Sequence, residues 1–212
     1  MKSSHFLLLT VLALTLTACS EPDRPSVPLY LAVQRGDLDQ VERHIYWRTD
    51  INTALRDGKY PLHVAAEKGR IVMVRTLLKH GAEINSTSSD GDTPVELAVL
   101  NGRTQIAELM LEQGASLDAS RLLLKAARAG VMDRDTVRFL IGLGADTESR
   151  NDAGDTPLLI AIRQDNHRLA THLVNQGADV NAKTRDGQSA LTLARALNFP
   201  ELISLLSRQG AR

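Results

Sequence analysis

The chain has 212 residues, with 25 basic and 25 acidic side chains and therefore no formal net charge. This balance argues against a general nucleic-acid-binding protein, which needs an excess of Lys and Arg to displace counterions from phosphates. The low aromatic content, 3%, is typical of a core built from small aliphatic side chains. Because Cys19 is the single cysteine, the sequence excludes an intramolecular disulfide and a zinc site with several thiolate ligands.

The first 18 residues have the pattern of a signal peptide. A basic residue precedes an apolar run over residues 6–18, which is too short for a membrane-spanning helix of about 20 residues. The run ends in the tetrapeptide Leu-Thr-Ala-Cys, which resembles the lipobox of bacterial lipoproteins. This resemblance implies removal of residues 1–18 and lipidation of the Cys19 thiol. The alternative is an ordinary secretory signal in which Cys19 has no special role.

The residues after Cys19 predict where the protein is anchored. Ser20 follows the cysteine, and in lipoproteins of two-membrane bacteria a residue other than Asp at this position implies the outer membrane, with the protein facing the periplasm. Each buried CH₂ group of an acyl chain contributes about 0.8 kcal/mol, so several chains anchor a protein stably. Residues 19–26 include two prolines and predict a short, extended lipidated tether. We expect membrane contact through this N-terminal lipid only.

The rest of the chain contains an internal repeat. Glycines followed by alanine recur at spacings of 33, 30, 33 and 33 residues, at Gly81, Gly114, Gly144, Gly177 and Gly210. Pro61 and Pro94 are also 33 residues apart, and so are Gly154 and Gly187. Three markers in phase indicate a repeat array.

Each repeat predicts a turn, a helix, a loop and a second helix. In the third repeat Thr93 suits the N-cap, Pro94 the first helical position and Glu96 the third, which together form a capping box. Gly102 ends this helix, and apolar residues at helical spacing follow from Ile106.

Two segments show which family the repeat resembles. Tyr60–Gly69 is similar to the ankyrin pattern Thr-Pro-Leu-His-x-Ala-Ala-x-x-Gly, and Leu77–Asn85 is similar to the end of the second ankyrin helix. The resemblance covers residues 27–212, in units at about 27–52, 53–85, 86–118, 119–148, 149–181 and 182–212. It implies an all-α ankyrin-repeat solenoid of helix-loop-helix units with short β-hairpin fingers.

The fourth unit departs most from this pattern. The segment before Leu122 is too short for a finger, and two extra residues lie near Val131–Arg134. We therefore expect a missing finger and a bulged loop. In the first unit Tyr46 and Trp47 are expected either to cover the end of the core or to belong to a binding patch.

In ankyrin proteins the partner usually contacts a concave strip made by the fingers and the first helix of each unit. Transferring those positions implies these partner-binding candidates: Tyr30, Arg56, Asp57, Lys59, Tyr60, Glu67, Lys68, Asp90, Asp92, Leu100, Asn101, Asp155, Arg163, Gln164, Arg185 and Gln188. For each of them the alternative is a solvated surface residue, and Tyr60 can instead pack between fingers.

Catalytic patterns are absent from the sequence. There is no His-Glu-x-x-His, no phosphate-binding glycine loop and no Gly-x-Ser-x-Gly. The resemblance gives His63 a structural role, namely a hydrogen bond between adjacent hairpins. We therefore predict no enzyme, no metal, no cofactor and no nucleic-acid partner, and we expect a monomer that binds another protein.

Two functions fit an anchored binding module. The first is an immunity protein or inhibitor that neutralises a toxic effector in the cell envelope. The second is a resident scaffold or accessory factor for a periplasmic enzyme or stress response. The sequence does not separate them.

Overall fold

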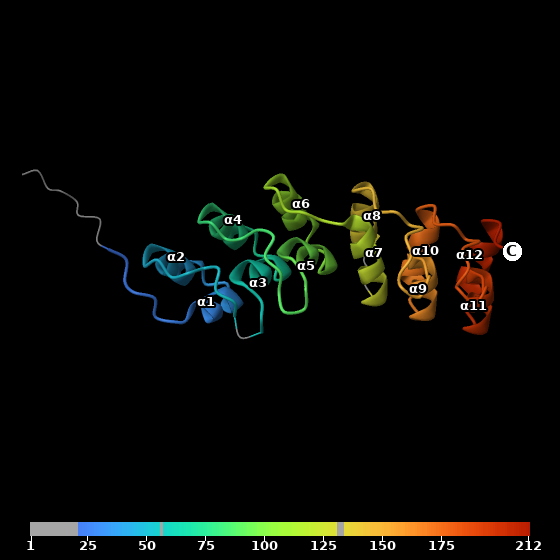
Figure 1. Cartoon of the computed structure of the whole chain (residues 1–212), viewed down its shortest axis with the longest axis horizontal. Helices are drawn as coiled ribbons and strands as arrows, with labels where there is room; N and C mark the ends of the chain where they lie inside the picture. The colour runs from blue at the N-terminus through green and yellow to red at the C-terminus, as the bar shows by residue number, and fades with distance from the viewer. Residues whose placement is uncertain (1–20, 56, 131–133) are drawn as a thin grey trace, which may run out of the picture.

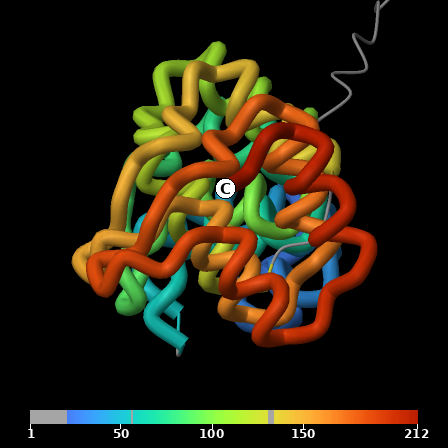
Figure 2. The backbone as a smooth tube through the Cα atoms, turned by 90° about the vertical axis from the view of Figure 1, so that its right-hand side faces the viewer, coloured from blue at the N-terminus to red at the C-terminus, as the bar shows by residue number. Residues whose placement is uncertain are grey.

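The computed structural model describes residues 21–55, 57–130 and 134–212. In these ranges twelve helices form six antiparallel pairs that stack side by side along one axis (Figure 1). Viewed from the C-terminal end, successive pairs overlie one another (Figure 2). None of the helices in the described ranges is long and apolar enough to cross a membrane. The predicted all-α solenoid is confirmed.

The first helices of the six pairs line one side of the stack and the second helices the other. The first helices are α1 Leu29–Arg35, α3 Pro61–Glu67, α5 Pro94–Leu100, α7 Ala119–Arg128, α9 Pro157–Arg163 and α11 Ala190–Ala196. The second helices are α2 Leu38–Tyr46, α4 Ile71–Lys79, α6 Thr104–Glu112, α8 Arg134–Gly142, α10 His167–Asn175 and α12 Pro200–Arg208. Helix α3 packs on α1 and α5, and α9 packs on α7 and α11.

Local sequence explains where the helices begin. Thr93 lies just before α5, and its hydroxyl accepts a hydrogen bond from the Glu96 backbone N–H, while the Glu96 carboxylate accepts one from the Thr93 N–H. This is the predicted capping box, which satisfies two N–H groups that the helix itself cannot. Asp118 caps α7 in the same way by accepting from the Arg121 N–H at 2.9 Å.

Small side chains let the stacked first helices approach closely. Ala65, Ala98, Ala161 and Ala194 occupy equivalent positions in α3, α5, α9 and α11, and all four are fully buried. Larger aliphatic side chains, mostly leucine and valine, complete the buried core. Because no pair can bury its apolar face alone, each unit depends on its neighbours for its core.

The fingers are tight turns instead of long hairpins. Residues 80–93, between α4 and α5, make such a finger, which is closed by a hydrogen bond from the Ser88 N–H to the Asp92 carbonyl at 2.8 Å. An antiparallel bridge joins Lys183 and Ser189 in the last finger. Elsewhere in the described residues the fingers have no β-bridge.

The fourth unit lacks a finger, as predicted. Six residues, 113–118, join α6 to α7, whereas fourteen residues, 80–93, join α4 to α5. Helix α7 has ten residues and the other five first helices have seven, so an extra helical turn extends toward the place of the missing finger. The predicted bulged loop includes residues 131–133, which lie outside the described residues.

Candidate protein-binding surface

The predicted binding residues fall into three groups by exposure. Those that are exposed are Tyr30, Asp57, Lys68, Asp90, Asn101, Arg163, Gln164, Arg185 and Gln188. Those that are half-buried are Lys59, Tyr60, Glu67 and Leu100, and those that are buried are Asp92 and Asp155. Arg56 and the lipidation candidate Cys19 lie outside the described residues.

Several of the predicted charges already pair within the chain. Lys59 Nζ lies 2.6 Å from Glu67 Oε2, and this hydrogen bond raises the pKa of the Lys59 ammonium. Asp155 Oδ2 lies 3.2 Å from Arg163 Nη1, so the buried carboxylate has a partner. These contacts hold fingers against first helices, because each pair joins a finger to the helix that follows it.

Two other predicted residues bond to backbone. The Arg185 guanidinium donates to the carbonyl of Asp152 at 3.1 Å and thereby links the fifth and sixth fingers. The Asn101 side-chain amide donates to the Leu97 carbonyl at 2.8 Å, which caps the end of α5. Both side chains stay exposed and available to a partner.

His63 joins the second and third units. Its Nε2 lies 2.9 Å from the Asp92 carbonyl oxygen, and its Nδ1 accepts from the Tyr60 N–H at 3.3 Å. Burial lowers the pKa of the His63 imidazole below its ordinary value of 6.5, since the charged form would lose its solvation. The structural role predicted for His63 is confirmed. The described residues contain no group of three or more His, Cys, Asp or Glu side chains that could hold a metal.

A groove runs along α7 where the finger is missing. One hollow of about 490 Å³ lies over the helix and is lined by Arg121, Leu124, Lys125, Arg128, Ala129 and Asn151. A second, of about 310 Å³, lies between α7 and α9 and is lined by Arg128, Asn151, Asp152, Ala153, Asp155, Ile160, Arg163 and Gln164. Arg128 and Asn151 line both hollows, so the two adjoin. We call the combined surface the α7 groove.

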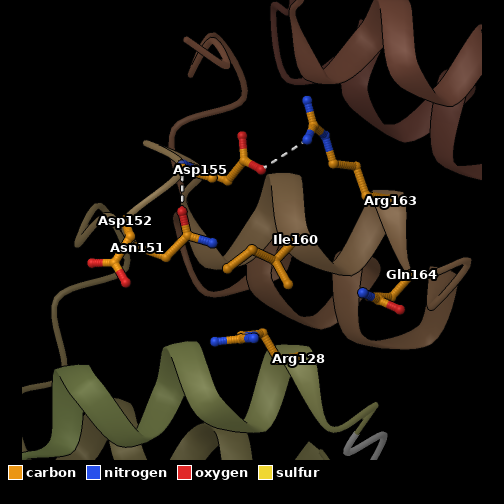
Figure 3. A pocket seen from close by; sticks show the side chains of 8 residues that line it. Arg128, Asn151, Asp152, Asp155, Ile160, Arg163 and Gln164 are labelled. Carbon is orange, nitrogen blue, oxygen red and sulfur yellow. Dashed lines mark hydrogen bonds and ion pairs between the residues drawn. The ribbon is translucent and has the colours of Figure 1, made fainter.

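Side chains from three elements meet at the second hollow (Figure 3). Arg128 rises from α7, Asn151 and Asp152 come from the finger of the fifth unit, and Ile160 and Gln164 come from α9. Ile160 supplies an apolar wall beside polar groups. This mixture of an apolar patch and a few directed polar groups is what binding sites for protein side chains commonly provide.

The basic residues of α7 differ in what they contact. Arg121 pairs with Glu96, and Lys125 pairs with Asp92, so both reach back to the third unit. Within the described residues Arg128 has no hydrogen-bond or ion-pair partner. The α7 groove therefore contains one unpaired guanidinium, which favours an acidic group on whatever binds there.

The sequence-based prediction included Asp155, Arg163 and Gln164 of this groove but missed its α7 residues. The fourth unit has no finger, so the usual family positions could not be transferred to it. The available signal was the spacing of Arg121, Lys125 and Arg128, which places three cations on one face of a helix.

Solved structures with this arrangement include two bacterial ones. One is the complex of a predatory endopeptidase from Bdellovibrio bacteriovorus with an immunity protein, matched with a TM-score of 0.69 at 25% identity over 88% of this chain and 100% of that chain. The other is an ankyrin repeat domain from Acinetobacter baumannii, with a TM-score of 0.67 at 28% identity over 87% of this chain and 98% of that chain.

Curated relatives match over shorter segments. A putative ankyrin repeat-containing protein of Treponema pallidum is 33% identical over 84 residues, which is 40% of this chain and 28% of that protein. The chain spans only 3% to 28% of the length of such relatives. The family model for ankyrin repeats (3 copies) matches residues 29–121 and 123–212. The chain therefore belongs to the ankyrin repeat family.

Proposed function

We propose that the chain is a membrane-anchored periplasmic protein-binding module that inhibits a toxic envelope effector, as an immunity protein does. The α7 groove carries the binding part of the proposal, because it offers an unpaired guanidinium and an apolar wall on a stacked, well-packed scaffold. A scaffold that already holds these groups in place loses less conformational entropy when it binds a partner. The fold resemblance to the endopeptidase–immunity protein complex supports an enzyme as the partner.

The anchoring part of the proposal depends on the N-terminal sequence. The lipobox-like tetrapeptide favours lipidation of Cys19, and Ser20 favours the outer membrane. An inhibitor held at this surface protects its own cell from an effector that arrives in the periplasm. Metabolic labelling with a palmitate analogue tests this part, because Cys19→Ser should abolish the label.

The partner can be identified by site-specific photocrosslinking in living cells. A photoreactive residue at Ala129, exposed in the α7 groove, should crosslink to one protein, whereas the same residue at Arg75, exposed on α4, should not. Capture of a toxin or peptidase delivered by competing siblings supports inhibition, and deletion of the chain should then sensitise cells to that effector.

Other results separate the alternatives. A resident periplasmic protein as the crosslinked partner, with an envelope-stress defect and no toxin sensitivity, would favour the scaffold function. Equal crosslinking from Ala129 and Arg75 would contradict the α7 groove as the binding surface.

A further inference from the structure

The segment that precedes α1 is fixed to the first unit. The Trp47 indole N–H donates to the Pro22 carbonyl at 3.2 Å, and the guanidinium carbon of Arg24 lies 4.9 Å from the centre of the Trp47 ring. Arg43 Nη1 lies 3.6 Å from the Asp23 carboxylate. These contacts lie at the C-terminal end of α2.

Buried polar groups hold the same segment closer to α1. The Ser26 N–H donates to the Gln40 side-chain oxygen at 2.8 Å, and His44 Nε2 lies 2.8 Å from the Val27 carbonyl oxygen. Gln40 and His44 are both buried. Residues 22–27 are therefore a docked extension of the first unit, whereas the sequence predicted a short, extended tether over residues 19–26.

Docking leaves little free chain near the anchor. Cys19 and Pro22 are three residues apart, and an extended chain spans at most about 3.5 Å per residue. A lipid on Cys19 therefore brings the membrane within about 10 Å of the site where Pro22 meets Trp47. This site is at the α1/α2 end of the solenoid, and α12 is at the other end (Figure 1).

The side chains at this end suit a lipid headgroup layer. Tyr46 is 50% exposed, and its ring packs edge-on against Trp47 with the ring centres 5.6 Å apart. The Arg24 guanidinium lies over the Trp47 ring, and Arg48, the next residue along the chain, is exposed. Tyr and Trp concentrate at membrane interfaces because each has an apolar body and a polar tip, and Arg can reach lipid phosphates from there.

We propose that Arg24, Tyr46 and Trp47 form a contact surface for the phospholipid layer, which holds the solenoid with its first unit against the membrane and its last unit away from it. The inference rests on the lipidation of Cys19 in the proposed function, and it replaces the sequence-based expectation that the lipid is the only membrane contact. It adds a fixed orientation: the α7 groove is held at a defined height above the membrane, where a freely tethered solenoid would sample all heights.

Trp47 is the only tryptophan, so its fluorescence reports directly on this contact. The lipidated protein is reconstituted in vesicles of phosphatidylethanolamine and phosphatidylglycerol that contain phosphatidylcholine brominated near the headgroup end of its acyl chains. Bromine quenches indole emission at short range. We expect about a twofold loss of Trp47 emission relative to vesicles without bromine, as for an interfacial indole.

A second variant reports on the far end of the solenoid. Trp47→Phe combined with Leu197→Trp moves the indole to an exposed position after α11 and keeps an aromatic ring at position 47. Its emission should stay unquenched. Unlipidated Cys19→Ser protein, mixed with the same vesicles, should also show no quenching.

The outcomes separate this inference from the proposed function. Equal quenching at both ends, or none at Trp47, in protein whose lipid is verified by mass spectrometry would overturn the orientation and leave the anchor intact. Absence of lipid on Cys19 would overturn both, whereas loss of partner binding with normal Trp47 quenching would count against the α7 groove alone.

Discussion

The imidazole of His63 and the backbone carbonyl of Asp92 meet at 2.9 Å across the junction between the second and third units. Because the Nδ1 atom of His63 accepts from the Tyr60 N–H, the ring is neutral and its Nε2–H is the donor. One buried side chain thus orders its own helix start and the finger of the next unit.

Replacing His63 with Ala should destabilise the solenoid. The substitution removes one of the two donors to the Asp92 carbonyl, leaving the Ser88 N–H, and opens a cavity at a fully buried position. We expect a loss of about 2 kcal/mol in the free energy of unfolding. Urea denaturation monitored by circular dichroism measures it. The control is His80→Ala at an exposed position, which should change the stability by less than about 0.5 kcal/mol. Equal effects of the two substitutions would contradict the junction role.

The same histidine predicts a pH dependence of stability. Its pKa is lowered in the folded state, so the unfolded chain takes up the proton more readily. Stability should therefore fall as the pH drops below the ordinary value of 6.5 and should level off, for this group, below the folded-state pKa. Denaturation midpoints measured across this window should decline in the wild type and decline less in His63→Asn. Parallel declines would show that His63 is not the responsible group.

We expect Glu96 to couple the stability of the third and fourth units. Its side chain is 2% exposed, caps α5 and pairs with Arg121 of α7. Glu96→Ala should lower the free energy of unfolding by about 2 kcal/mol, because it removes part of the α5 capping box and the buried carboxylate that pairs with the exposed Arg121 guanidinium. Glu112→Ala at an exposed position at the end of α6 is the matched control and should be nearly neutral. Hydrogen exchange should show the loss concentrated at the amides of α5 and α7, and a uniform loss would speak against this coupling.

Two glycines distinguish the cost of a strained backbone from the cost of a steric clash. Gly36 and Gly114 both have positive φ, 76° and 92°, so Ala is strained at either position. A Cβ at Gly36 would also collide with the Arg70 guanidinium, which donates to the Val33 carbonyl at 2.8 Å, whereas a Cβ at Gly114 meets open space. Gly114→Ala should lower the free energy of unfolding by about 1 kcal/mol, as measured by thermal unfolding. Gly36→Ala should lower it by more, because the Arg70 guanidinium must move away and lose its hydrogen bond to the Val33 carbonyl. A smaller loss for Gly36→Ala would contradict the clamp formed by Arg70.

Much of the fold could be predicted from sequence because the same pattern of residues recurs in successive units. The capping box at Thr93 and the missing finger before α7 depend on local chemistry and chain length, and both are found in the structure. The extra turn of α7 could not be predicted, since Asp118 is a helix cap only once the finger is gone.

The candidate surface was harder to predict. The binding positions transferred from the ankyrin family lie mostly on the fingers, so they included Asp92 and Asp155. The carboxylates of these two residues are buried and paired with Lys125 and Arg163. The hollow beside Arg128 is formed jointly by α7, the fifth finger and α9, so no single segment of the sequence predicts it. The docked segment before α1 was also missed, because Gln40 and His44 bond to it from positions with no distinctive sequence pattern.

Charge reversal in the α7 groove tests the proposed binding most directly. Isothermal titration of the crosslinked partner, once purified, would compare the wild type with Arg128→Glu and with Arg168→Glu, an exposed residue of α10 on the opposite layer. We expect Arg128→Glu to raise the dissociation constant about 30-fold or more and Arg168→Glu to leave it unchanged. Unchanged affinity in Arg128→Glu, or an equal loss in Arg168→Glu, would contradict binding through the α7 groove.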